Sequence, residues 1–397
     1  MKGRELITER RAVQHLMDCL KVEGLSGREG KVSQLVRRKL LELGCKKSWI
    51  TQDSVHRKLE DFEVGNLIVK LPGTTRAPRR LLMSHLDTVP LCRGAKPVRR
   101  GNRVVSSAKT AVGADNRSAV ACIISVFEAI LRYKLPHPPL TALFTVGEEV
   151  GLCGARHVKL GDLGRPKLGV NIDSGDPATL IVGATSADRW NVHVYGASSH
   201  AGMHPEDGIS ATLIASRAIT DVAARGYFGK VKKRKKQGTS NVGVFEGGEA
   251  TNQVTDYVFI KGESRSHDRK FVTEITSAYR KAFERAAKSV KNHKRKSGRV
   301  VFRSEEDYAA FHLATTSPVV RFTQDAVREI GLKPILRSVD GGLDANHLYA
   351  KGVPTVTIGA GQHGAHTTDE YVDLREYLGG CRLALELMTR EAVTPKT

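Results

Sequence analysis

Hydrophobic residues in the first half of the chain occur in short runs separated by polar or amphipathic stretches. The runs that predict strands are NLIVKL (66–71), LLMS (81–84), LTALFTV (140–146), LGVNI (168–172) and TLIVG (179–183). Residues 118–131 carry apolar side chains three and four positions apart, which predicts a helix with one apolar face. Strands that alternate with helices in this way are typical of an α/β sheet.

The pattern changes after Asp188. Trp190, Val192 and Val194 alternate strictly with polar residues, as in a strand with one buried face. The segments that follow predict a helix at 208–224, strands at NVGVF (241–245) and YVFIKGE (257–263), and a long helix at 270–288. This order indicates a separate α+β unit.

The α/β pattern returns after residue 303. It predicts helices at 318–330 and 374–390 and strands at KPILRSV (333–339) and VPTVTI (353–358). We therefore expect one α/β domain, residues 1–183 and 304–397, interrupted by an α+β domain at 184–303. The α/β domain should hold a mixed, mostly parallel sheet between helices.

Composition is consistent with a soluble two-domain protein. The chain has 397 residues, of which 40% are hydrophobic. Neither the first 20 residues nor any later stretch has the apolar run of a signal peptide or a membrane span, so we expect a cytoplasmic protein without membrane contact. The six cysteines lack paired C-x-x-C spacing, which predicts reduced thiols and no disulfides.

The chain is strongly basic, with a formal net charge of +21. Two segments hold much of the excess, KVKKRKK at 230–236 and KSVKNHKRKSGR at 288–299. They are either solvated surface or a site for a polyanion such as a nucleic acid. Neither segment contains the aromatic residues on which bases stack, so we do not expect nucleic-acid binding.

Acidic and imidazole side chains follow the predicted strands or begin the helices. They are His85 and Asp87 in SHLDTVP, Asp115 in GADNRSAV, Glu148 and Glu149 in GEEVGLCGA, Asp173 in NIDSG, and His366 in HGAHTTDEYV. Open α/β sheets place their ligand crevice at this edge. Histidines that converge with carboxylates there would suit zinc, cobalt or manganese.

These motifs, together with GASSHAG and DGGLDANHL, resemble those of the di-zinc exopeptidases and amidohydrolases. That family includes peptidase T, carboxypeptidase G, acetylornithine deacetylase and aminoacylase. The resemblance extends from about residue 80 to the C-terminus, and EEVGLCGA and HTTDEY are most similar to the peptidase T branch.

The resemblance implies a metal site with two zinc ions per subunit, which cobalt or manganese could replace. Asp115 would bridge the two ions. His85 and Asp173 would bind one of them, and Glu149 and His366 the other. A bridging carboxylate holds two cations about 3.5–4 Å apart, and the pair would polarise the scissile carbonyl.

Three further positions follow from the same resemblance. His363 is the rival of His366, which we prefer because family members place the ligand four residues before the glutamate that is here Glu370. Asp87 would fix the tautomer of His85, and Glu148 would act as the general base. Glu148 and its neighbour Glu149 can take different roles only on an irregular turn, since in a strand they would point in opposite directions.

The spacing of the ligands locates the inserted domain. His85 and Asp115 are too close for an insertion, whereas 193 residues separate Asp173 from His366. The insertion therefore corresponds to the lid domain of the family, through which some members form homodimers, and we expect a homodimer here.

Within the lid, His200 matches the histidine that donates to the oxyanion, often from a partner subunit. Asn252 and Arg265 match positions that hold a substrate carboxylate. On the sequence alone, His200 could equally be a simple loop residue and Arg265 an exposed residue of an edge strand.

The motif DGGLDANHL (340–348) has two interpretations. Its glycines could let the backbone approach a substrate, or the segment could be a turn in which Asp344 caps a helix.

Together these features predict a zinc-dependent exopeptidase that hydrolyses short peptides, most similar to a tripeptide aminopeptidase. A deacylase of N-acyl amino acids or a carboxypeptidase would use the same metal site. A nucleic-acid-binding protein on an inactive scaffold is a third hypothesis, which the complete set of ligand residues opposes.

Overall fold

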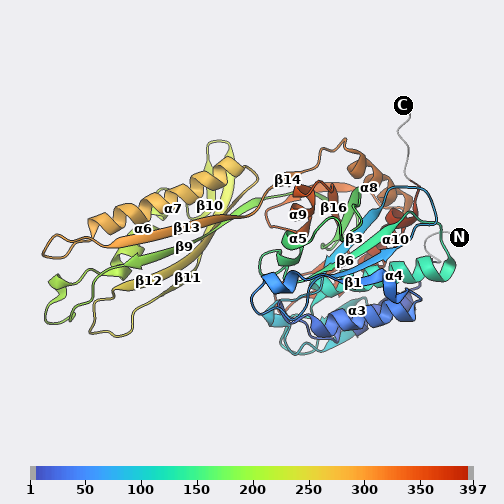
Figure 1. Cartoon of the computed structure of the whole chain (residues 1–397), viewed down its shortest axis with the longest axis horizontal. Coiled ribbons are helices and arrows are strands. Elements are labelled where there is room, and N and C mark those ends of the chain that lie inside the picture. Colours follow the sequence, from blue (N-terminus) through green and yellow to red (C-terminus); the bar gives the residue numbers. More distant parts are fainter. Residues whose placement is uncertain (1–5, 392–397) are drawn as a thin grey trace. The chain divides into compact units, whose positions relative to one another are not determined.

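The computed structural model describes residues 6–391, which form two compact units (Figure 1). The main unit comprises the chain up to Gly183, His312–Val339 and the chain from Leu343 onward, and the inserted unit comprises Ala184–Phe311 and Asp340–Gly342. The predicted end of the insertion at 303 lies inside strand β13 (Arg299–Tyr308). That strand stays paired with β9 (Ser186–Tyr195) as far as Tyr308, so the inserted unit extends beyond the predicted boundary.

The main unit is built on a nine-stranded mixed sheet. Its order is β1-β2-β6-β3-β7-β16-β8-β14, and β15 pairs with β8. The strands are β1 (Ile50–Gln52), β2 (Leu67–Leu71), β3 (Arg80–His85), β6 (Leu140–Thr145), β7 (Leu168–Ile172), β8 (Thr179–Ala184), β14 (Phe311–His312), β15 (Ile335–Val339) and β16 (Thr355–Ile358). The central strands β6, β3, β7 and β16 run parallel, so their carboxyl ends share one edge.

Helices cover both faces of this sheet (Figure 1). They are α2 (Glu9–Leu20), α3 (Gly30–Glu42), α4 (Ala114–Tyr133), α5 (Cys153–His157), α8 (Pro318–Glu329), α9 (Asp344–Ala350) and α10 (Leu374–Thr389). Helices α2 and α10 pack against α4, and α5 packs against α9. Leu81 and Met83 of β3 point into the core beneath α5 and α9, where they meet Ala155 and Leu348. The central strands are buried on both faces, which is why they read as continuous apolar runs.

A second sheet of the main unit is small. Its order is β17-β18-β5-β4, with strands β4 (Pro97–Arg100), β5 (Arg103–Ser106), β17 (Gln362–His363) and β18 (Tyr371–Asp373). Through the pairing of β5 with β18, this sheet connects the segment before α4 with the segment before α10.

The inserted unit is an antiparallel sheet with two helices on one face. The sheet order is β10-β11-β12-β9-β13, with β10 (Gly229–Lys233), β11 (Lys236–Gly247) and β12 (Tyr257–Ser266). Helices α6 (Ala211–Ala224) and α7 (Arg269–Ser289) bury Trp190, Phe271 and Phe283 against it. The other face of the sheet carries polar and charged side chains and, where β9 ends, a cluster of the rings of His193, Tyr195, Tyr257 and Phe259.

The helices predicted at 118–131, 208–224, 270–288, 318–330 and 374–390 are present, each with ends that shift by a few residues. Among the elements that the sequence did not predict are α2, α3, β10 and β13. The last two are the edge strands of the inserted unit, and edge strands commonly carry charges in place of the apolar alternation that identifies a strand. Among the helices of residues 6–391, none has the length and apolarity that crossing a membrane requires.

Candidate metal centre

The five predicted metal ligands lie where strands of the main unit end. His85 is the last residue of β3, and Asp173 follows β7 directly. Asp115 is the second residue of α4, where the backbone departs from helical geometry with ψ 105°. Glu149 lies in the turn after β6, and His366 lies in the loop before β18. The sheet thus gathers side chains from distant parts of the sequence at one edge.

His85 and two aspartates form one half of the site. Nε2 of His85 lies 3.1 Å from Oδ1 of Asp115 and 3.8 Å from Oδ1 of Asp173. The amide of Asp173 donates to the carbonyl of Ile358, and Gln362 donates to its carboxylate at 3.2 Å. These contacts hold the Asp173 side chain beside the buried His85 ring.

His366 and Glu149 form the other half. Nε2 of His366 lies 3.0 Å from Oε2 of Glu149 and 3.6 Å from Oδ2 of Asp115. One ligand atom each from His85, Asp115 and Glu149 lie within 4.8 Å of one another. Asp115 thus presents one carboxylate oxygen to each imidazole, which is the arrangement that a bridging ligand needs.

The tautomer of His85 fits a metal ligand. Its Nδ1 lies 3.1 Å from the carbonyl oxygen of Asp87 and 3.3 Å from Oδ1 of the same residue. Both atoms are acceptors, so the proton belongs on Nδ1 and the lone pair of Nε2 points at Asp115 and Asp173. An imidazole lone pair among carboxylate oxygens suits zinc or a similar divalent cation.

The electrostatics of the site also favour a cation. Burial raises the pKa of the Asp173 carboxyl, and the negative charge of Asp115 raises it further. Burial likewise raises the pKa of Glu149, and that of Glu148 well above its usual value. A raised carboxyl pKa means that the ionised groups lack sufficient positive charge around them, which a divalent cation would supply.

The two adjacent glutamates lie on a turn, as the sequence predicts. Gly147 begins it with φ +60°. The carboxylate of Asp87 accepts hydrogen bonds from the amides of Glu148 at 3.0 Å and Glu149 at 3.2 Å, and from the hydroxyl of Ser26 at 2.7 Å. Asp87 therefore orients both the His85 ring and the turn that carries the glutamates.

The two candidate histidines of the C-terminal loop have different partners. His366 contacts Glu149, whereas Nε2 of His363 pairs with the carboxylate of Glu376. The His363 ring also stacks on Tyr371, with 5.0 Å between ring centroids. This geometry favours His366 as the ligand.

Two buried glutamates near the site have supporting roles that the sequence did not predict. Glu370 accepts hydrogen bonds from the amides of Gly113 at 2.6 Å and Asp115 at 3.0 Å, and burial raises its pKa to about 7. Glu29 accepts from the amide of Gly147 at 3.0 Å, and burial raises its pKa to about 7 as well. Both support the segments that carry the ligands. Glu29 lies in no motif that indicates this role, and Glu370, although part of HGAHTTDEYV, serves in the sequence only to locate His366.

The interpretation of Asp344 as a helix cap is wrong. It is the first residue of α9, and Leu343 occupies the cap position. The Asp344 side chain is 1% exposed and bonds to the hydroxyl of Thr145, and burial raises its pKa to about 7. It therefore lies in the interior close to the end of β6, where His85 and Asp173 influence its charge.

His200 and Asn252 lie together in the inserted unit. Nδ1 of the exposed His200 accepts hydrogen bonds from the amides of Gly202 at 3.2 Å and Met203 at 3.1 Å, which places the ring proton on Nε2. The carbonyl of Asn252 accepts from the amide of Ala201 at 2.8 Å. Within residues 6–391 the donor nitrogen Nε2 has no hydrogen-bond partner, so it can face a ligand.

Arg265 lies at the other end of the same sheet. It pairs with Glu263 at 2.8 Å on β12. The loop that carries His200 follows Tyr195, which pairs with Tyr257 at one end of the sheet. Arg265 lies further along the same strand as Tyr257, and a rise of about 3.3 Å per residue puts it about 26 Å from that end. Within the inserted unit, the structure therefore does not bring Arg265 and His200 together.

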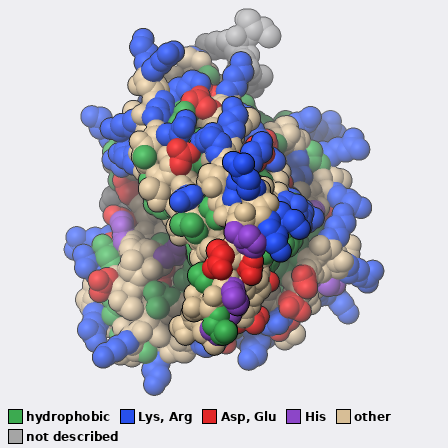
Figure 2. Space-filling view, turned by 90° about the vertical axis from the view of Figure 1, so that its left-hand side faces the viewer, with side chains coloured by type: hydrophobic (Ala, Val, Ile, Leu, Met, Phe, Trp, Pro, Cys, Tyr) green, Lys and Arg blue, Asp and Glu red, His purple; other side chains and the backbone are tan. Residues whose placement is uncertain are grey.

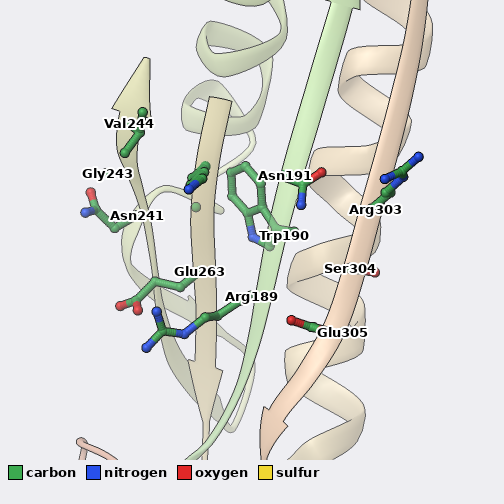
Figure 3. A pocket seen from close by; sticks show the side chains of 12 residues that line it. Arg189, Trp190, Asn191, Asn241, Gly243, Val244, Glu263, Arg303, Ser304 and Glu305 are labelled. Carbon is green, nitrogen blue, oxygen red and sulfur yellow. The ribbon is translucent and has the colours of Figure 1, made fainter. Parts of the chain in front are cut away.

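A groove of about 580 Å³ lies on the face of this sheet that α6 and α7 do not cover (Figure 3). Arg189, Lys261 and Arg303 line it together with Glu263 and Glu305. It contains none of the predicted metal ligands, and its charges are mixed. The groove is therefore separate from the site of the predicted chemistry.

Comparison with known proteins extends these observations. Residues 81–390 match the profile of Peptidase family M20/M25/M40. An uncharacterised protein of Bacillus subtilis, YqjE, is 28% identical over 98% of this chain and its own entire length. Peptidase T of Clostridium botulinum is 26% identical over 68% of this chain, and the match spans 63% of that protein.

Two solved structures are similar over nearly the whole chain. A tripeptidase of Staphylococcus aureus has a TM-score of 0.85 and 28% identity, with 97% of this chain and 98% of that chain covered. The aminopeptidase PepT of Bacillus cereus has a TM-score of 0.81 and 29% identity, with 97% and 99% covered.

Proposed function

Since the chain belongs to peptidase family M20/M25/M40, a family of metal-dependent hydrolases, we propose that it is a di-zinc aminopeptidase acting on tripeptides. The observation that carries the proposal is the convergence of His85, Asp115 and Glu149, with Asp173 and His366 alongside, at one sheet edge. The similarity to a tripeptidase and to PepT supports the choice of substrate.

We assign the five ligands as the sequence resemblance implies. Asp115 would bridge two zinc ions, His85 and Asp173 would hold one, and Glu149 and His366 the other. When bound, zinc lowers the pKa of water toward neutrality and polarises a carbonyl. Cobalt or manganese would satisfy the same nitrogen and oxygen donors.

Glu148 is the proposed general base. Its carboxyl is adjacent to the ligand Glu149, but the turn directs it to a different environment near Asp173 and Asp344. Its raised pKa suits a group that takes a proton from the attacking water and passes it to the leaving amine. Asp87 holds the turn and the His85 ring in position through its contacts with both.

His200 is the proposed oxyanion donor. Its Nε2 carries the proton, because two backbone amides occupy Nδ1. It lies at the end of the sheet far from the Ala184 and Phe311 junctions of the inserted unit, so we propose that it serves the site of a second subunit in a homodimer. Asn252 lies beside it, and Arg265 would hold the substrate carboxylate.

A substrate panel with zinc-loaded protein tests this proposal. Free tripeptides, their N-acetylated forms, dipeptides and N-acyl amino acids are compared, with chelator-treated enzyme as the control. Cleavage of free but not acetylated tripeptides is expected, because an aminopeptidase must recognise the amine. Cleavage of N-acyl amino acids alone would identify a deacylase, and release of the C-terminal residue a carboxypeptidase.

The assignment of the base needs its own variant. Glu148→Gln should lower kcat by about 10²–10⁴-fold while the zinc content stays unchanged, since Gln keeps the shape of the side chain and cannot take a proton. Unchanged turnover in Glu148→Gln would refute the assigned mechanism.

A further inference from the structure

A second pocket of the inserted unit, of about 370 Å³, lies where the β10–β11 hairpin meets the end of β12. Four basic side chains line it: Lys230, Lys235, Lys236 and Arg265. Three of them belong to the basic run 230–236, and the fourth is the residue assigned to the substrate carboxylate. Basic side chains also predominate on the face of the molecule shown in Figure 2.

The cations of this pocket are only partly neutralised. Lys236 pairs with Glu274 at 3.3 Å. Lys230 and Lys235 have no carboxylate partner within residues 6–391, and both are exposed. Arg265 donates one nitrogen to Glu263, while its Nε is buried without a hydrogen-bond partner in the same part of the chain. The pocket therefore offers unpaired donors at its wall and its rim.

The two acidic residues that line the pocket are already engaged. Asp268 caps α7 by accepting from the amides of Lys270 at 2.8 Å and Phe271 at 3.3 Å. Asp340 lies 3.1 Å from Nε2 of His267. Neither carboxylate forms an ion pair with the lysines, so the pocket keeps a positive potential.

The neighbouring groove shows that this charge is not a general property of the sheet. Figure 3 shows Arg189 and Arg303 in that groove together with Glu263 and Glu305. Lys261 also lines the groove, and Arg189 is paired with Asp307 at 2.5 Å. Opposite charges there lie side by side. Three basic and two acidic side chains line the groove, whereas four basic and two acidic side chains line the hairpin pocket.

We propose that the hairpin pocket binds an acidic side chain of the peptide substrate next to the carboxylate held by Arg265. The enzyme would then prefer peptides that carry glutamate or aspartate at the C-terminal position. This inference rests on the proposed function, and it gives the basic run 230–236 a role in substrate selection. A C-terminal acidic residue presents two carboxylates a few ångströms apart, which matches an arginine with lysines beside it.

A nucleic acid fits this pocket less well. None of its lining residues is Phe, Tyr or Trp, so it offers no platform on which bases could stack. A polynucleotide would also need a long path of phosphate contacts, whereas the unpaired donors here are gathered in one small concavity.

The size of the preference follows from the exposure of the lysines. An exposed ion pair contributes a factor of about two to five in affinity, so two or three of them give about tenfold. The effect should appear in KM, because the contact is the same in the ground state and in the transition state. It should decline at about 1 M salt, where the Debye length is about 3 Å.

The test compares Ala-Ala-Glu, Ala-Ala-Gln and Ala-Ala-Ala with zinc-loaded protein. We expect kcat/KM for the Glu peptide to exceed that for the Gln peptide about tenfold at low salt. Lys230→Gln/Lys235→Gln should reduce this ratio to about two by raising KM for the Glu peptide. The control Lys281→Gln/Lys288→Gln removes the same charge from exposed positions of α7 and should keep the full ratio.

The outcomes separate the two proposals. Equal rates for the Glu and Gln peptides, or a ratio that survives in Lys230→Gln/Lys235→Gln, would overturn the specificity pocket while the peptidase assignment stands. Loss of the ratio in the α7 control as well would show that net charge, and not the pocket, selects the substrate. Failure to cleave any free tripeptide would overturn the proposed function itself.

Discussion

Replacement of Asp87 by Asn isolates the role of its carboxylate. In the native protein, Oδ1 accepts from the amide of Glu148 at 3.0 Å and lies 3.3 Å from Nδ1 of His85, while Oδ2 accepts from the amide of Glu149 at 3.2 Å and from Ser26 at 2.7 Å. An Asn side chain has one carbonyl oxygen, so it can accept hydrogen bonds at the position of Oδ1 or of Oδ2, but not at both. At least one buried amide then faces an NH₂ group and loses its acceptor.

The magnitude follows from these contacts. One unsatisfied buried amide should lower the free energy of unfolding by about 1–3 kcal/mol. Loss of the negative charge beside His85 should weaken zinc binding by about 10–100-fold, as for other carboxylates that orient a histidine ligand. Competition with a chromogenic chelator measures the zinc affinity, and urea unfolding of the metal-free protein measures the stability.

Ser26→Ala is the matched control for this substitution. It removes one hydrogen bond to the same carboxylate and leaves the contacts with His85, Glu148 and Glu149 in place. Its zinc affinity should stay within about threefold of the native value, a change of well under 1 kcal/mol. The reasoning is refuted if Asp87→Asn binds zinc as tightly as the native protein, because the carboxylate would then have no influence on the ligand.

Three further perturbations have distinct expected results. His366→Ala should lose bound metal and turnover, whereas His363→Ala should retain its metal, and elemental analysis of the two variants distinguishes them. Burial raises the pKa of the Glu128 carboxyl, but its contacts with His15 and Arg11 lower the pKa by more, so the pKa in the folded protein lies below its usual value. The Glu128 carboxylate therefore stabilises the folded protein above about pH 4.5, and this stabilisation is lost as the pH falls through the folded-state pKa. Glu128→Gln should therefore lose stability at pH 7, with a difference from the native protein that narrows in acid; a constant difference would contradict this. Phe283→Ala should destabilise the inserted unit by about 3–5 kcal/mol in thermal unfolding, since the ring is fully buried.

The fold class follows from the sequence to a large extent. The central strands of the main unit are buried on both faces, so their apolar runs stand out, and the helices that cover them have a regular apolar face. The sequence pattern does not predict strands β10 and β13, because they are the edge strands of their sheet and carry charged residues. For the same reason the sequence pattern predicts an end of the inserted unit at 303, before the end at Phe311, since β13 follows a basic segment and has no clear alternation.

The sequence by itself determined the chemical types of the site. His85, Asp115, Glu149, Asp173 and His366 stand in local motifs at strand ends, and the number of residues between them locates the insertion. Motifs of this kind are visible because the ligands lie near strand ends or at a helix start, from which they reach the sheet edge.

Only the tertiary structure decided which groups meet. It pairs His366 with Glu149 and His363 with Glu376, and it buries Glu370 beneath Asp115. Most of these contacts join residues far apart in the sequence, as between Asp115 and Glu370 at a separation of 255, and no local pattern encodes them. They result from the packing of whole strands and helices, which sets distances and burial, and through burial the charge that each carboxyl carries.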